Sequence, residues 1–232
     1  MRMLKPLLLL CGTLLLAACV RPSTVPKIQP LAVTDTVRTL TAGVSLSIHT
    51  QRGGVSARGY LVYQQPDSFR LVITTPFGAT VAELYGSDDS LSVVVPGKRT
   101  VYSGSIRGLL PQSPLRNWGR MRWVMTPLTE RPGTPGTRER LTAEGVPETV
   151  VYDANGLAER MTTASGVEAR YQGYRLYNGA AVPDVIEVAD GYGDTVKLTL
   201  DDPEVNQKLD EGMVHPDSTG YEVYPLDEFK GF

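Results

Sequence analysis

Apolar and polar residues alternate over much of the chain. Val44, Leu46 and Ile48 are separated by serines and followed by His49, a pattern that predicts a strand with one buried and one solvated face. His49 lies on the solvated side of that strand. Shorter runs of the same kind predict further strands at residues 57–63, 69–74, 79–85, 90–95, 100–102, 149–152, 157–163, 167–174, 185–189 and 195–200.

The breaks between these runs carry residues that favour tight turns. Asn155-Gly156 is a strong hairpin signal, and glycine, proline and aspartate mark the other breaks. Residues 190–194 lack the ligand spacing and closing glutamate of an EF-hand calcium loop, so we interpret them as a turn as well. Parallel neighbours need about a dozen connecting residues. The pattern therefore predicts a mainly β fold built on a strongly curved antiparallel sheet.

Two segments have the spacing of short helices. Residues 34–41 begin with Thr34 as a possible cap and carry apolar residues three apart. Ser113 is followed by a proline, with Leu115 and Trp118 three apart, which predicts a helix that lies against the sheet.

Two further segments carry no periodic pattern. Residues 126–137 contain three prolines and two glycines and predict a long loop. Residues 206–232 are acidic, and we expect this tail to wrap the surface or to stay mobile.

The N-terminus has the pattern of a secretory signal. Two basic residues precede an apolar run at residues 7–16, which is too short to span a bilayer core of roughly 30 Å. Leu16-Ala17-Ala18-Cys19 resembles the bacterial lipobox. That resemblance implies that residues 1–18 are removed and that Cys19 carries lipid. An ordinary signal peptide with a coincidental cysteine is the alternative.

Lipidation would change the chemistry left to the mature chain. Each buried methylene contributes about 0.8 kcal/mol, so two or three acyl chains on Cys19 would hold the protein on a membrane. Cys11 leaves with the signal, and no thiol would remain for a disulfide, a metal or a nucleophile. Residues 19–40 would form the tether, and Val20 in place of the aspartate of inner-membrane retention signals favours the outer membrane.

Composition excludes several classes of function. The formal charge of −2 gives no excess of positive charge for binding nucleic acid. The only two histidines, His49 and His215, are far apart in the sequence, which disfavours a site that needs clustered imidazoles. The aspartate pairs at residues 88–89 and 201–202 are interpreted as solvated turns rather than catalytic carboxylates. We therefore predict no catalytic site, no metal site and no cofactor other than the covalent lipid, and we do not expect an enzyme.

One block of sequence is specific enough to suggest a family. Residues 70–84, from the arginine that opens an apolar strand through Thr-Pro-Phe-Gly to a second alternating strand, resemble the core of LolB, the outer-membrane lipoprotein receptor. Leu-Arg-Asn-Trp at residues 115–118 and Tyr-Gln-Gly-Tyr at residues 171–174 resemble the family more loosely. The resemblance implies an open, incomplete β-barrel over residues 41–205, with a hydrophobic cavity and a short helical or loop lid.

The resemblance also implies a function. A protein of this family accepts acylated lipoproteins from a periplasmic carrier of the LolA type and inserts them into the outer membrane, to which its own lipid anchors it on the periplasmic side. We expect a monomer. A structural or accessory envelope lipoprotein of the same fold, which binds a protein partner or another lipid, is the alternative.

Two sets of residues are candidates for such a site. The first comprises apolar residues that would line the groove: Val44, Leu46, Ile48, Leu61, Leu71, Ile73, Leu115 and Trp118. Alternatively, these side chains are simply core. The second is the turn formed by Pro76, Phe77 and Gly78, where an aromatic ring at the tip would contact a membrane or a partner unless it folds back over the sheet.

Overall fold

The computed structural model describes residues 31–232 except positions 52, 110–112, 114, 119, 143–144, 192, 211 and 232. The predicted signal, the lipidation site at Cys19 and the tether up to residue 30 lie outside the described residues. So does Pro114, the proline at the start of the predicted second helix.

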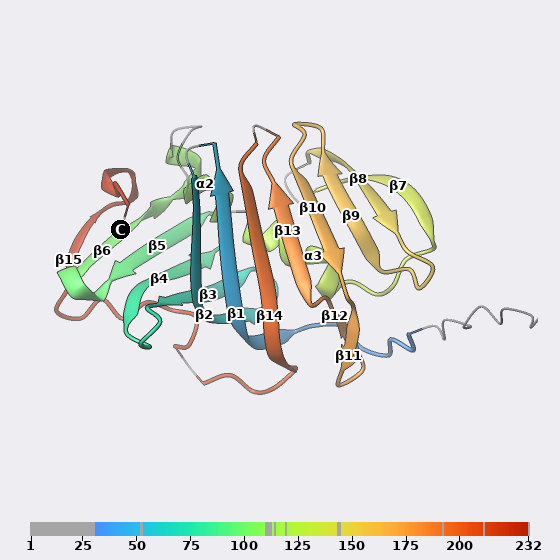
Figure 1. Ribbon diagram of the computed structural model, residues 1–232, viewed down its shortest axis with the longest axis horizontal. Helices are drawn as coiled ribbons and strands as arrows, with labels where there is room; N and C mark the ends of the chain where they lie inside the picture. The colour runs from blue at the N-terminus through green and yellow to red at the C-terminus, as the bar shows by residue number, and fades with distance from the viewer. Residues whose placement is uncertain are drawn as a thin grey trace, which may run out of the picture. The chain divides into compact units, whose positions relative to one another are not determined.

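One large sheet dominates the structure (Figure 1). Thirteen strands pair in the order β15-β6-β5-β4-β3-β2-β1-β14-β13-β10-β9-β8-β7. The first half is an antiparallel meander of β1 (Thr39–Thr50), β2 (Gly53–Gln64), β3 (Ser68–Thr74), β4 (Thr80–Ser87), β5 (Ser90–Val95) and β6 (Thr100–Ser105).

The second half of the sheet joins the first through antiparallel pairing of β1 with β14. Its strands are β7 (Gly136–Leu141), β8 (Pro147–Tyr152), β9 (Ala158–Thr163), β10 (Glu168–Gln172), β13 (Val185–Ala189) and β14 (Thr195–Val205). A separate hairpin is formed by β11 (Arg175–Tyr177) and β12 (Ala180–Val182). The edge strands β15 and β7 do not pair with each other, so the sheet is curved but not closed, as predicted.

The predicted alternation decides which side chains are buried. In β1, Leu40, Ala42, Val44 and Leu46 are buried while His49 is exposed, as expected. Where β2 approaches β3, a Cβ on Gly59 would lie 1.7 Å from the carbonyl oxygen of Val72, so only glycine fits there. Residues from both halves of the sheet join one apolar core cluster on the concave side.

Two short helices lie on the concave side of the sheet. The predicted helix at Ser113 is found as α2 (Leu115–Trp118), and it is followed by α3 (Met121–Thr129). Figure 1 shows α3 behind β10, β13 and β14. The prediction of a loop over residues 126–137 is wrong at both ends, because α3 includes Pro127 and β7 starts at Gly136. Pro127 has no N–H to donate to the carbonyl oxygen of Trp123, and the helix ends two residues after it.

The predicted helix over residues 34–41 is wrong. The chain there is extended, and β1 already begins at Thr39. The side chain of Asn206 accepts hydrogen bonds from the backbone N–H of Arg38 (2.8 Å) and of Thr39 (3.4 Å), and the N–H of Val37 donates to Leu128 (2.9 Å). These hydrogen bonds to residues distant in the sequence keep residues 37–39 out of a helix, although the local spacing of apolar residues favoured one.

Part of the C-terminal tail lies along the sheet edge. We call residues 206–231 the C-terminal strap. Its strand β15 (Glu222–Pro225), which the sequence did not predict, pairs with β6 in parallel. Tyr221 packs on the outer residues Tyr85, Val94 and Val101, and Leu226 is buried in the main core. In this structure β15 and Leu226 therefore place part of the tail against the sheet, one of the two arrangements expected from the sequence.

Candidate functional site

Helix α3 covers the concave face of the sheet. Its apolar residues Met121, Val124, Met125 and Leu128 are all at most 4% exposed. They recur at positions three and four apart, so one face of the helix is apolar and turns toward the sheet. The nine residues of α3 thus occupy the space in which the sequence predicted a hydrophobic groove.

The predicted groove residues do come together in this region. Five of them are buried in the core cluster: Val44, Leu46, Leu61, Leu71 and Leu115. The other three, Ile48, Ile73 and Trp118, are partly buried and pack against that cluster. They pack against neighbouring side chains of the same core. The concave face is therefore filled by the protein itself while α3 is in place.

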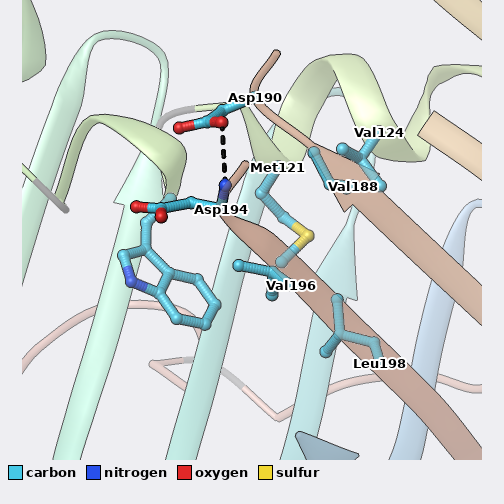
Figure 2. A pocket seen from close by; sticks show the side chains of 8 residues that line it. Met121, Val124, Val188, Asp190, Asp194, Val196 and Leu198 are labelled. Atoms are coloured by element: carbon cyan, nitrogen blue, oxygen red, sulfur yellow. Dashed lines mark hydrogen bonds between the residues drawn. The ribbon is translucent and has the colours of Figure 1, made fainter. Parts of the chain in front are cut away.

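A small hollow remains at one end of this interior. Figure 2 shows Met121 and Val124 of α3 facing Val188 of β13 and Val196 of β14, with the turn from Asp190 to Asp194 above them. The space open to the centres of water-sized spheres is ≈ 30 Å³, enough for about one or two waters. Ligand pockets are typically about 300–1,000 Å³. An acyl chain would fit only after α3 moves away from the sheet.

Polar contacts tie α3 to β7 and β8. The indole N–H of Trp123 donates to the carboxylate of Glu148, which is only 5% exposed and also accepts from Nε of Arg140 at 2.6 Å. Nη1 of Arg140 donates in turn to Glu130, directly after the helix, at 2.6 Å. Burial opposes the charge of Arg140, but the hydrogen bonds and negative charges of Glu130 and Glu148 outweigh it and raise the pKa of Arg140 above its ordinary value.

Two more contacts hold the helix from the other directions. The buried hydroxyl of Tyr171 on β10 donates to the carbonyl oxygen of Val124 at 2.8 Å, and burial raises the pKa of Tyr171, so this donor keeps its proton. Arg122 forms ion pairs with Asp67 (3.7 Å) and Asp88 (3.6 Å), which lie in turns of the first half of the sheet. Helix α3 is thereby tied to both halves of the sheet.

The turn between β3 and β4 presents an isolated aromatic ring. The N–H of Gly78, whose φ is +84°, donates to Thr75 at 2.9 Å, and the N–H of Ala79 donates to the hydroxyl of Thr75 at 3.1 Å. This bonding fixes the Pro76-Phe77 tip, and Phe77 is 98% exposed. The alternative in which the ring folds back over the sheet is wrong.

The residues that hold α3 were not found from the sequence. Trp123 and Glu148 are 25 positions apart and Arg140 lies in the segment next to the predicted loop. A glutamate directly before the predicted strand at residues 149–152 is the one signal that could have drawn attention to Glu148. Among the described residues, no group of histidine, cysteine, aspartate and glutamate could hold a metal ion.

The same part of the chain contains no helix long and apolar enough to cross a membrane.

Two solved structures share this fold at low sequence identity. A DUF1329 family protein from Desulfovibrio piger superposes with a TM-score of 0.58 at 12% identity, covering 78% of this chain and 91% of that chain. A protein domain from Vibrio parahaemolyticus, described as outer membrane lipoprotein-sorting, gives 0.54 at 10% identity, covering 76% and 89%. A LolA superfamily protein from Nitrosomonas europaea gives 0.47 at 14% identity, covering 78% and 91%. The search of curated proteins found no match.

A family model gives the more specific result. The model described as outer membrane lipoprotein LolB matches residues 40–202, which include all but the first residue of β1, the strands from β2 to β13 and most of β14. The matched range holds α3, the turn with Phe77 and the sequence block at residues 70–84, and the resemblance drawn from that block is confirmed. The chain therefore belongs to the LolB family of outer membrane lipoproteins.

Proposed function

We propose that this protein is a receptor that accepts acylated lipoproteins from a periplasmic carrier and inserts them into the outer membrane. It would be anchored there by lipid on Cys19 and would act without covalent chemistry. The observation that carries the proposal is the combination of an apolar concave face covered by one short helix and a fully exposed aromatic ring at the β3–β4 turn.

Acceptance of cargo requires an exchange of apolar groups. The side chains of α3 fill the concave face, so an acyl chain that enters must displace them. Because one apolar group replaces another, the area kept from water changes little, and the free-energy cost is set by the polar ties of α3. The free-energy change for moving the acyl chains from the similar interior of a carrier would then be close to zero. Their delivery into the bilayer would drive the transfer to completion.

Phe77 would serve the delivery step. An aromatic ring that is 98% exposed gains free energy on entering a membrane, since burying a phenylalanine side chain is worth about 1.5–3 kcal/mol. The rigid turn around it would bring the receptor's surface against the bilayer while the cargo leaves.

The test replaces Phe77→Glu in the full lipidated chain. The variant should fold like the wild type and still take cargo from the carrier, but insertion of that cargo into liposomes should fall at least tenfold. Val55→Glu is the matched control, because Val55 is a 66% exposed apolar residue on β2, and this variant should insert normally. Normal insertion by the Phe77→Glu variant would remove the proposed role of the turn.

One observation favours a second function. The concave face holds no space for an acyl chain while α3 is in place, as expected of a structural or accessory envelope lipoprotein. A photoreactive benzoylphenylalanine at Trp118 separates the two functions, with the same group at the exposed His49 as the control. Crosslinking of acylated cargo at Trp118 alone supports the receptor, and crosslinking at neither position supports the structural role.

A further inference from the structure

The side of α3 that faces away from the interior borders two adjoining hollows. The first, ≈ 320 Å³, lies between the two halves of the sheet. The turn between β4 and β5 and the 3-10 helix η2 (Ile106–Gly108) form one wall. Thr142, Val146 and the β9–β10 loop form the other wall, and the start of α3 is the floor.

The second hollow, ≈ 350 Å³, continues along α3 beside β7 and β8. Arg122, Trp123 and Thr142 line both hollows, so we treat them together as the seam cleft. Each hollow alone is within the range of about 300–1,000 Å³ that is usual for ligand sites. This space exists while α3 is in place, in contrast to the filled interior on the other side of the helix.

The walls of the seam cleft are partly apolar. Ile106 and Trp123 are partly buried in it, whereas Leu141 and Val146, on the β7–β8 side, are 65% and 40% exposed. Two exposed aliphatic side chains at the rim of a hollow are unfavourable in water and favour an occupant with hydrocarbon groups.

The charges of the seam cleft are balanced, since four arginines and four carboxylates line it: Arg107, Arg120, Arg122 and Arg140 with Asp88, Asp89, Glu130 and Glu148. Arg107 pairs with Asp89 at 3.2 Å, and Arg122 pairs with Asp88 at 3.6 Å and with Asp67 at 3.7 Å. On the β7–β8 side, Arg140 is bound between Glu130 and Glu148. An anionic ligand such as a phosphate would have to compete with these carboxylates. The cleft offers arginine N–H donors on a surface without excess charge, which suits a neutral ligand rich in hydrogen-bond acceptors.

Under the proposed function, the cargo itself carries a neutral group rich in hydrogen-bond acceptors, which we call its neck. In an acylated lipoprotein, a glyceryl thioether with two ester carbonyls and one amide carbonyl joins the acyl chains to the first residues of the protein. We propose that the seam cleft binds this neck. The inference rests on the proposed function and adds a second subsite to it, for the part of the cargo that stays outside the interior.

The position of the seam cleft agrees with this role. Trp123 lines the cleft, while its neighbour Val124 lines the hollow on the interior side of the same helix. A cargo whose acyl chains had displaced the apolar side chains of α3 from the interior would leave its neck at the outer side of that helix, which forms the floor of the seam cleft.

The experiment measures binding of a fluorescent triacylated cysteinyl tetrapeptide to the full lipidated protein in nonionic detergent. Val146→Asp should raise the Kd for this lipopeptide about tenfold, because a carboxylate at the rim disfavours the glyceryl esters. Val55→Asp, an exposed control on β2, should leave it within twofold. Palmitate, which has no neck, should bind all three proteins equally.

The outcomes separate the two proposals. If the wild type binds no lipopeptide, the proposed function fails. If the wild type binds it and the Val146→Asp and Val55→Asp variants bind equally well, the function stands and the neck subsite is overturned. If phosphatidylethanolamine displaces the lipopeptide as effectively as unlabelled lipopeptide does, the cleft recognises membrane glycerolipid and the assignment to cargo is also overturned.

Discussion

Apolar side chains lie in opposite environments in α3 and in the β3–β4 turn. Met125 of α3 is 0% exposed and belongs to the main core, whereas Phe77 of the turn is 98% exposed. Burial of a side chain of this size is worth about 1.5–3 kcal/mol, so Met125 contributes to stability and Phe77 does not. The comparison separates residues that hold the fold from one that is free to act on something outside it.

We expect the largest effect from a charge placed in the core. Met125→Asp would bury a carboxylate with no partner among the residues of the α3 core, and we expect a loss of at least about 4 kcal/mol, enough to unfold a protein of ordinary stability. Urea unfolding followed by circular dichroism measures this. Met125→Leu should cost less than about 1.5 kcal/mol, and equal losses in both variants would contradict the core assignment.

The ties of α3 provide the next largest effect. Glu148→Ala removes the partner of the Trp123 indole and one partner of Arg140, and we expect a loss of about 2–4 kcal/mol in the free energy of unfolding. Glu130→Ala removes the more exposed partner of the same arginine and should cost less than about 1 kcal/mol. A reversed order of the two losses would show that Glu148 does not hold the helix.

At the exposed turn, replacing an apolar residue by a polar one should have little effect on the free energy of unfolding. Phe77→Ser should alter the free energy of unfolding by less than about 0.5 kcal/mol. Phe69→Ser, at a residue of β3 that is 3% exposed, should by contrast cost several kcal/mol, on the order of 3–5. A large destabilisation by Phe77→Ser in thermal unfolding would mean that the ring packs against the protein in solution.

The smallest effect concerns the carboxylate that pairs with Arg122. Burial and the negative charge of Asp88 raise the pKa of Asp67, against the opposing charge of Arg122. Asp67 therefore binds its proton more tightly in the folded state, and the wild type gains stability as the pH falls through that raised pKa. The difference in Tm between Asp67→Asn and the wild type should be most positive at neutral pH and should shrink toward pH 4.

Asp217 serves as the control of opposite sign. The backbone N–H of Thr219 bonds to Asp217 and lowers its pKa, so this carboxylate stabilises the protein above its unfolded pKa and loses that effect as the pH falls. Asp217→Asn should therefore lower Tm at neutral pH, with the difference also shrinking in acid. Equal signs for the two variants would contradict the environments described for these residues.

The sequence predicted those parts of the structure that local patterns determine. Strands with one buried face, the Asn155-Gly156 turn and helix α2 all have short-range signals, and the exposed position of Phe77 follows from the Pro-Phe-Gly turn. The curved antiparallel sheet followed from the number of hairpins.

The remaining parts depend on pairing between distant residues. Strand β7 carries Arg138, Glu139 and Arg140 at a sheet edge, and every described residue of β15 is exposed, so neither shows the alternation of a half-buried strand. The hydrogen bonds around Glu148 join a helix to two strands, and no periodic pattern in the sequence indicates them. Filling of the concave face by α3 depends on where that helix packs, which its sequence alone does not determine.

The C-terminal strap has a consequence for how the protein is made. Strand β15 comes from residues 222–225, and β6, which it covers, was synthesised more than a hundred residues earlier. Until residues 222–225 pair with it, β6 is therefore an unpaired sheet edge, and a folding chain can associate with its neighbours through that edge. A truncation before residue 222 would leave that edge permanently unpaired.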